Sequence, residues 1–254
     1  MMAGVGVLLR KELLEAWRTL RLPVVAAVFV LIGLGSPLLA RFTPELLKAL
    51  GGGQFQIVLP TPTTADAVDQ LIKNVGQFGI LVAVLLAMGS VASEKERGTA
   101  GLILTKPASR GAFLASKLIA IGATLLVAVV FAAGAAWFYT LVLFEPLPVA
   151  GFAASAVLQW LALMSFAAIT FLGSTLSGSA LAAAGLGVAA FLVIGVLSVF
   201  PAIAPFLPVG LGAPARALAL GQPVDDVLRP VLANVAIVSA SLATAWLSFR
   251  RQEL

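Results

Sequence analysis

The longest charged segment of this chain, residues 93–117 (SEKERGTAGLILTKPASRGAFLASK), lies between two long apolar runs. It contains two carboxylates and five cations: Glu94, Glu96, Lys95, Arg97, Lys106, Arg110 and Lys117. These side chains are suited to ion pairs and hydrogen bonds with another protein. Because a polar segment of this kind cannot lie in hydrocarbon, we predict a loop at one face of a membrane and interpret it as a partner-contacting surface.

The spacing inside this segment predicts a short amphipathic helix that lies along the membrane surface. Ser93 and Glu96 have capping-box spacing, and Gly98 ends the turn. Ser109 can cap a second helix that carries Arg110 and Lys117 at the level of the headgroups. Between the two helices, Leu102, Ile103 and Leu104 form an apolar projection, and Pro107 ends the element. Taken alone, Glu94 and Glu96 are equally consistent with a solvated charged face.

The composition indicates that the solvent of this chain is lipid. Hydrophobic residues make up 61% and charged residues 11%, whereas soluble domains average roughly 45–50% and about 25%. The absence of cysteine excludes disulfides and thiolate chemistry, and the absence of histidine removes the commonest metal ligand and general base. The net charge of +5 comes from basic residues that flank apolar runs, which is a membrane-orientation signal and not one for nucleic acid.

The fold class is therefore predicted as an all-α integral membrane protein, with residues 1–254 forming a single transmembrane domain. A spanning helix needs about 20 apolar residues, and six segments meet that requirement. They are Leu22–Ala40, Val75–Ala92, Leu118–Leu143, Ala150–Gly173, Ala180–Phe200 and Val231–Phe249.

An amphipathic helix is predicted over residues 5–21, ahead of the first span. Leu9, Leu13, Trp17 and Leu20 share one face, which is typical of a helix in the headgroup plane. A signal peptide is disfavoured, because the segment contains Glu12 and Glu15 and no convincing cleavage site follows. The predicted interfacial anchors are Arg10, Lys11, Trp17, Arg18 and Arg21.

The distribution of basic residues predicts that both termini and the 93–117 loop are cytoplasmic. With six spans the termini share a side, and that side receives eleven of the sixteen basic residues. Residues 41–74 and 201–230 are then extracytoplasmic loops, and the second is rich in Pro and Gly. Residues 66–73 could form a short helix with Thr63 or Thr64 as its N-cap.

The spans lack the groups that would power transport. They contain no Asp, Glu, Lys or Arg, and their main polar side chains are Gln77, Gln159 and Asn234. This argues against a proton-driven carrier and an intramembrane protease. No phosphate-binding loop of the form G-x-x-x-x-G-K-[ST] is present, so any driving energy must come from another subunit. The small pairs Ser174/Gly178 and Ala183/Gly187 favour packing within the bundle over dimerisation.

The order of residues in the central loop resembles the membrane-spanning subunits of type-2 ATP-binding-cassette (ABC) transporters. In that family the loop between the second and third spans carries the pattern E…GT…L…P.SR…K. The matching positions here are Glu94 or Glu96, Gly98, Thr99, Leu102, Leu104, Pro107, Ser109, Arg110 and Lys117. The order of spans and loops resembles the family along the whole chain.

The resemblance implies a permease subunit, not itself an enzyme, that pairs with a second copy or a related permease in the cell membrane. Its short loop helix would be the coupling helix, docked on a cytoplasmic ABC ATPase subunit present in two copies. ATP and Mg would bind to that ATPase, with no cofactor on this chain and no role for nucleic acid. Residues 176–179 would make a second, smaller contact, and replacing Glu94 and Glu96 by alanine would weaken ATPase binding. The family favours export, while a non-transporting membrane scaffold is the alternative function.

The resemblance also implies paired re-entrant half-helices near the outer face, within residues 201–230. Residues that break helices are frequent there. The outer gate would contain Pro201, Pro205, Pro208, Gly210, Gly212 and Pro214.

Overall fold

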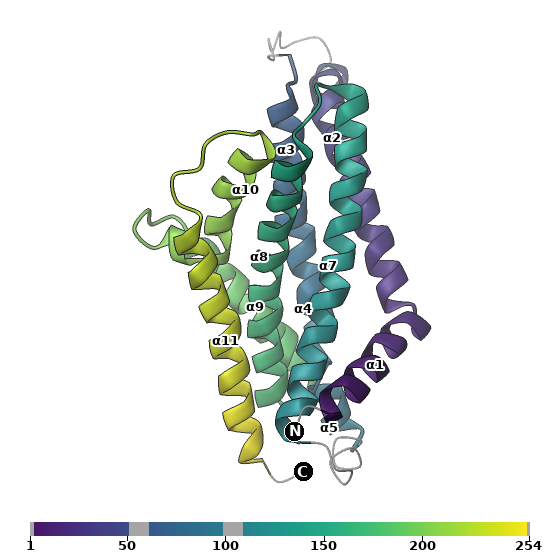
Figure 1. Cartoon of the computed structure of the whole chain (residues 1–254), viewed down its shortest axis with the longest axis vertical. Coiled ribbons are helices and arrows are strands. Elements are labelled where there is room, and N and C mark those ends of the chain that lie inside the picture. The colour runs from purple at the N-terminus through teal and green to yellow at the C-terminus, as the bar shows by residue number, and fades with distance from the viewer. Residues whose placement is uncertain (1–2, 51–60, 99–108, 253–254) are drawn as a thin grey trace.

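The computed structural model describes residues 3–50, 61–98 and 109–252, and these ranges are helical throughout apart from short turns and loops. Six of the helical segments are long and apolar enough to cross a membrane, which confirms the predicted fold class. The α-helices, drawn in Figure 1, are α1 (Ala3–Arg18), α2 (Arg21–Leu50), α3 (Thr64–Asn74), α4 (Ile80–Met88), α5 (Ala92–Glu96), α7 (Arg110–Leu143), α8 (Val149–Leu176), α9 (Ala180–Leu197), α10 (Gly212–Ala219) and α11 (Leu228–Arg250).

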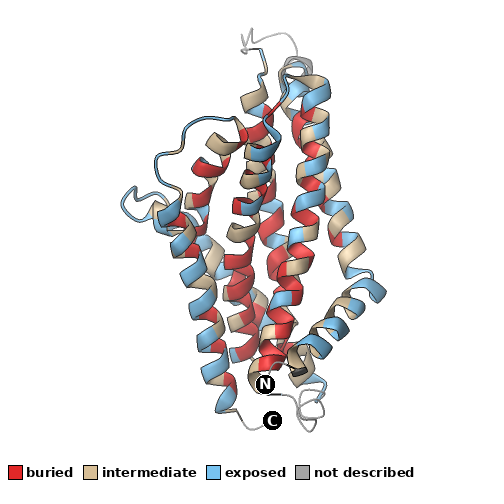
Figure 2. Ribbon diagram, in the orientation of Figure 1, coloured by how far each residue is buried: buried red, intermediate tan, exposed pale blue. Residues whose placement is uncertain are grey.

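The core of the bundle lies around α8 and α7. In the most apolar 18 residues of each span, 61% are buried in α8 and 50% in α7, but only 17% in α9 and in α11. Figure 2 shows the same contrast, with buried positions concentrated on α7 and α8 and exposed positions along α11. The apolar outer faces of α9 and α11 are consistent with a lipid environment.

The N-terminal helix is separated from the first span by a sharp corner. Helix α1 ends at Arg18, and Leu20 adopts a left-handed backbone conformation with φ of 59°. Helix α2 then starts at Arg21 and runs away from α1 (Figure 1). The helix predicted over residues 5–21 is therefore present over 3–18. The start of α1 lies at the same end of the bundle as the end of α11 (Figure 1).

The loop predicted over residues 41–74 is shorter than expected, because helices enter it from both sides. Helix α2 continues to Leu50 and includes Pro37 and Pro44. Proline removes a helical hydrogen bond. In both cases the hydroxyl of the residue before the proline, Ser36 or Thr43, donates to the carbonyl four residues before itself.

At the far end of this loop, Thr63 caps α3. The Asp66 carboxylate accepts hydrogen bonds from the Thr63 amide (2.8 Å) and hydroxyl (2.7 Å), so the predicted short helix is confirmed. Helix α3 continues into α4 through one π-helical segment, Val75–Gly79. A Cβ on Gly79 would lie 3.1 Å from Leu163 and 3.2 Å from Phe29, so glycine lets three helices meet there.

The Pro- and Gly-rich segment 201–230 is broken into short pieces, as predicted. It contains two 3-10 turns, η2 (Ala204–Phe206) and η3 (Pro208–Leu211), followed by α10. Pro205 and Pro208 lie in the first turns of these elements, where proline is tolerated. Gly210 approaches the Ala204 carbonyl so closely that a Cβ would clash at 2.3 Å. Re-entry of this segment into the membrane stays a prediction.

Candidate coupling site

The described part of the central loop, α5 and the start of α7, lies at the end of the bundle that also holds α1 and the end of α11 (Figure 1). Of the predicted coupling residues, Glu94, Glu96, Gly98, Ser109 and Arg110 are described. Thr99, Leu102, Leu104 and Pro107 lie outside the described residues.

Helix α5 is capped by another helix and not by its own serine. It begins at Ala92, so Ser93 is already inside it and the predicted capping box does not form. Instead the buried hydroxyl of Ser174, on α8, accepts hydrogen bonds from the amides of Val91 (3.1 Å) and Ala92 (3.0 Å). This contact satisfies amides that the helix start leaves unpaired and fixes α5 on the end of α8. Gly98 ends the turn as predicted, with φ of 67°.

Glu94 forms the centre of an ion-pair cluster that joins three helices. Its carboxylate lies 2.7 Å from the Lys117 ammonium on α7, and Lys117 also lies 3.0 Å from Glu12 on α1. The Lys117 side chain is only 5% exposed, and those of Glu12 and Glu94 are 15% and 17% exposed. A buried ammonium requires such partners, so this lysine holds α1, α5 and α7 together.

Lys11 extends the cluster toward the surface. Its ammonium lies 3.2 Å from Glu12, 3.5 Å from Glu15 and 3.8 Å from Glu94. Partial burial works to lower the pKa of Lys11, but Glu12, Glu94 and Glu15 together outweigh it and raise the pKa above its ordinary value. Lys11 therefore stays charged at neutral pH, and together with Lys117 it offsets two of the three carboxylate charges.

Glu96 and Lys95 connect α5 to the turn between α8 and α9. The Glu96 carboxylate accepts a hydrogen bond from the Ala180 amide (3.3 Å) at the start of α9. The Lys95 ammonium donates to the Thr175 carbonyl near the end of α8. This turn, where a second partner contact was predicted, is thus attached to the same short helix.

Arg110 binds the end of the last span. Its guanidinium donates to the carbonyls of Phe249 (2.8 Å), Arg250 (3.2 Å) and Gln252 (2.9 Å). These carbonyls belong to a helix end that leaves them without helical partners. Ser109 caps α7 as predicted, by accepting a hydrogen bond from the Ala112 amide (3.1 Å).

The coupling residues that sequence reasoning selected are thus in contact with this chain itself. Glu94 reaches α7 through Lys117, Glu96 reaches α9, and Arg110 reaches α11. Sequence reasoning missed Ser174 and Thr175 as their partners. A serine among apolar residues signals packing as readily as hydrogen bonding, so Ser174 was interpreted only as a small residue. The site links several helices through polar contacts, and the described residues contain no cluster suited to a metal ion.

The predicted interfacial anchors are all exposed on α1 or at the start of α2. They are Arg10, Lys11, Trp17, Arg18 and Arg21.

Among the predicted outer-gate residues, Pro208 and Pro214 are buried and the others are not. The buried Asn234, on α11, fixes this region in place. Its amide group donates to the carbonyls of Pro230 (2.8 Å) and Leu207 (3.4 Å) and accepts a hydrogen bond from Ser165 (2.7 Å).

Comparison with known proteins supports a membrane transport role. The profile of the family described as "ABC-2 family transporter protein" matches residues 7–209. A protein of Bacillus subtilis (strain 168), "Uncharacterized transmembrane protein YxlG", is 29% identical over 151 residues. That alignment covers 58% of this chain and 58% of the relative.

Proposed function

Since this chain belongs to the ABC-2 family of transporter proteins, we propose that it is the permease subunit of an ABC exporter. ATP hydrolysis takes place on a separate cytoplasmic ATPase subunit, present in two copies. A second permease, either the same chain or a related one, completes the membrane part. ATP and Mg bind to the ATPase, so this chain needs no cofactor of its own.

The observation that carries this proposal is the set of contacts made by α5. This five-residue helix is connected to α8 by Ser174, to α7 and α1 by the Glu94–Lys117–Glu12 cluster, and to α9 by Glu96. Arg110, the first residue of α7, connects the other end of the central loop to α11. A force applied to the central loop therefore reaches five long or interfacial helices through direct polar contacts.

In the proposed mechanism the ATPase acts on the loop between α5 and α7 from the cytoplasm. Nucleotide-driven closure of the ATPase pair displaces this loop together with α5. The polar contacts at the bases of α7, α8, α9 and α11 transmit the displacement as a tilt of these spans. A path between the two permeases then opens toward the outside or toward the outer leaflet.

The first experiment measures coupling in the purified complex with its ATPase. The double variant with Glu94→Ala and Glu96→Ala removes the contacts to α7 and α9. Because both carboxylates contact this chain itself, we revise the expectation of weakened ATPase binding. The variant should retain the ATPase in co-purification and lose substrate-stimulated ATP turnover. Loss of the ATPase itself would instead mean that these carboxylates contact the partner directly. Unchanged co-purification with unchanged stimulated turnover would refute a coupling role for both residues.

The proposed orientation has both termini in the cytoplasm, and single cysteines test it against a background without native cysteine. Cysteines at Thr105 and Arg97 should resist a membrane-impermeant maleimide in intact cells. A cysteine at Gln222, an exposed residue between α10 and α11, should react. Labelling of Thr105→Cys in intact cells would overturn the orientation and the coupling mechanism with it.

The alternative function is a membrane scaffold without transport. Assays in reconstituted vesicles distinguish it from a permease. A permease complex responds to its substrate with faster ATP turnover, and it moves the substrate only when ATP is present. A scaffold gives a constant ATPase rate whatever compound is added.

A further inference from the structure

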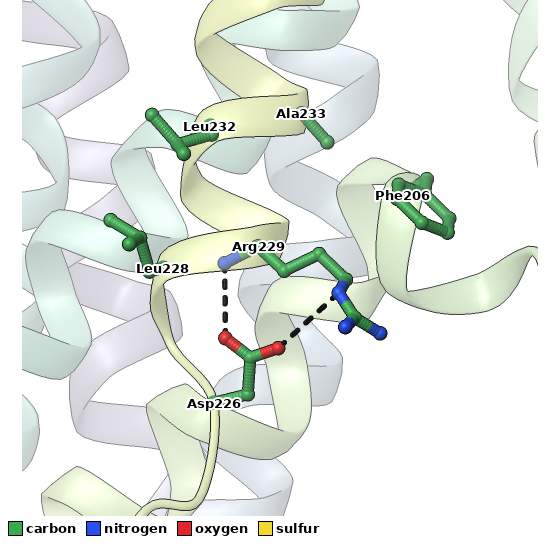
Figure 3. A pocket seen from close by; sticks show the side chains of 6 residues that line it. All are labelled: Phe206, Asp226, Leu228, Arg229, Leu232 and Ala233. Atoms are coloured by element: carbon green, nitrogen blue, oxygen red, sulfur yellow. Dashed lines mark hydrogen bonds and ion pairs between the residues drawn. The ribbon is translucent and has the colours of Figure 1, made fainter.

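An open pocket lies at the start of α11, away from the coupling site. Its volume is about 490 Å³, and its lining residues are Phe206, Asp226, Leu228, Arg229, Leu232 and Ala233. Figure 3 shows Arg229 between the Asp226 carboxylate and the ring of Phe206. The volume falls within the range of roughly 300–1,000 Å³ that is common for small-ligand pockets.

The apolar part of the pocket faces outward from the bundle. The exposed fractions are 66% for Leu228, 57% for Leu232 and 49% for Phe206. Phe206 is placed beside α11 because the neighbouring Leu207 carbonyl accepts a hydrogen bond from Asn234 (3.4 Å). Such a surface on a membrane-spanning helix meets lipid chains and not water.

Helix geometry places the polar rim of the pocket at a membrane boundary. Arg229 and Arg250 lie near opposite ends of α11, which spans Leu228–Arg250. At 1.5 Å per residue they are separated by about 31 Å, close to the ~30 Å thickness of the hydrocarbon core. With Arg250 at the level of one set of headgroups, Arg229 and Asp226 lie at the level of the other.

The rim carries one charge of each sign, close together and accessible. The Arg229 Nε lies 3.4 Å from the Asp226 carboxylate, and these side chains are 61% and 46% exposed. The Asp226 carboxylate also accepts a hydrogen bond from the Arg229 amide (3.1 Å), which fixes it against the helix start. The guanidinium lies 5.9 Å from the centre of the Phe206 ring. Within the described residues it has no further partner, so its terminal nitrogens are open to a ligand.

We propose that this pocket binds a zwitterionic phospholipid with a primary amine, in the leaflet opposite the chain termini. The lipid phosphate binds the terminal nitrogens of Arg229, which present two donors in a geometry that matches phosphate. The ammonium group binds Asp226. One acyl chain lies along Leu228, Leu232 and Phe206. The pocket carries no net charge, so it disfavours an anionic lipid. The headgroup of such a lipid has no ammonium group to place against Asp226.

Native mass spectrometry of the full-length chain, with lipids added one at a time, tests this proposal. The probes are phosphatidylethanolamine, phosphatidylcholine and phosphatidylglycerol with identical acyl chains. We expect phosphatidylethanolamine to bind most tightly. Arg229→Gln removes both charge-assisted hydrogen bonds to the phosphate and should weaken binding by more than about tenfold, the value of one such bond. Asp226→Asn should remove the preference over phosphatidylcholine and should not weaken phosphatidylglycerol.

Two further variants separate the site from general effects of charge and folding. Asp225→Asn removes the neighbouring exposed carboxylate, which does not line the pocket, and it should bind like the unaltered chain. Leu232→Trp fills the apolar part without a charge change and should reduce binding of all three lipids. Equal binding of the three lipids, or loss of preference in Asp225→Asn as well, would overturn the proposal. This test does not involve the ATPase, so its outcome is independent of the proposed transport function.

Discussion

The Lys117 ammonium and the Glu94 carboxylate lie 2.7 Å apart at the base of the bundle, and the lysine side chain is 5% exposed. This contact joins the short helix of the central loop to the longest span. Glu12 on α1 completes it at 3.0 Å. The charge that appeared from the sequence to face the headgroups is therefore an internal connection between helices.

Lys117→Met should destabilise the chain by about 3 kcal/mol, because it leaves Glu12 and Glu94 partly buried without a cation. Thermal unfolding in detergent measures the effect. The Lys11 side chain is 46% exposed, so Lys11→Met should lower the free energy of unfolding by less than about 1 kcal/mol. Adding Glu12→Gln and Glu94→Gln to Lys117→Met should recover much of the loss. An additive loss in the triple variant would contradict the ion-pair account.

Arg110→Gln should loosen the end of the last span, since it removes the donor to the carbonyls of Phe249, Arg250 and Gln252. Limited digestion with trypsin reports this change as cleavage after Arg250 and Arg251. We expect about tenfold faster cleavage, which corresponds to roughly 1.4 kcal/mol of lost protection. The control is Arg97→Gln, which alters an exposed arginine of the same loop. Equal cleavage rates in Arg110→Gln and the unaltered chain would show that the contact does not protect this end.

Gly33→Ala should destabilise the chain and Gly35→Ala should not, although both alter α2. A Cβ on Gly33 would lie 2.3 Å from the Ala132 carbonyl on α7, while a Cβ on Gly35 meets nothing within 4 Å. We expect Gly33→Ala to cost about 1–3 kcal/mol through overpacking. Gly35→Ala should be neutral or gain up to about 1 kcal/mol, because alanine favours helix more than glycine. Melting temperatures in detergent compare the pair, and a similar loss in both would contradict the close contact between α2 and α7.

Asn234→Leu should release the 3-10 turns from α11, because the Leu207 carbonyl and Ser165 lose their partner. A spin label on a single cysteine at the exposed Val209 reports the released motion as a sharper spectrum. Ser241→Ala changes another buried polar residue of α11 and should leave the spectrum unchanged. Equal mobility in the Asn234→Leu and Ser241→Ala variants would mean that packing alone positions these turns.

Hydropathy and charge were sufficient to predict the fold, since each span needs only an apolar run of adequate length. Local capping was predictable where both partners are close in sequence, as for Thr63 with Asp66 and for Ser109 with Ala112. The predicted cap at Ser93 was wrong, because the amides at the start of α5 bind a serine 82 and 83 residues away. Residues 41–50 are predicted as part of a loop because the first apolar run ends at Ala40, whereas α2 continues past Pro44 to Leu50.

For the candidate site, too, local features could be predicted from the sequence and long-range contacts could not. Its residues could be selected by type and by resemblance, but the partners of Glu94, Glu96 and Arg110 come from α7, α9 and α11. Such contacts depend on how the spans pack, and one sequence contains no direct signal for them. The pocket at the start of α11 was unforeseen for this reason, because it combines Phe206 in η2 with Arg229 in α11, with η3 and α10 between them in the chain.

The corner at Leu20 has a geometric consequence for α1. Glu12, which meets Lys117, lies eight residues before this corner, or about 12 Å along the helix axis. If the corner acts as a pivot, a sideways shift of about 2 Å at Lys117 swings α1 through about 10°. With such a pivot, small displacements at the base of α7 would rotate a helix on the rim of the molecule.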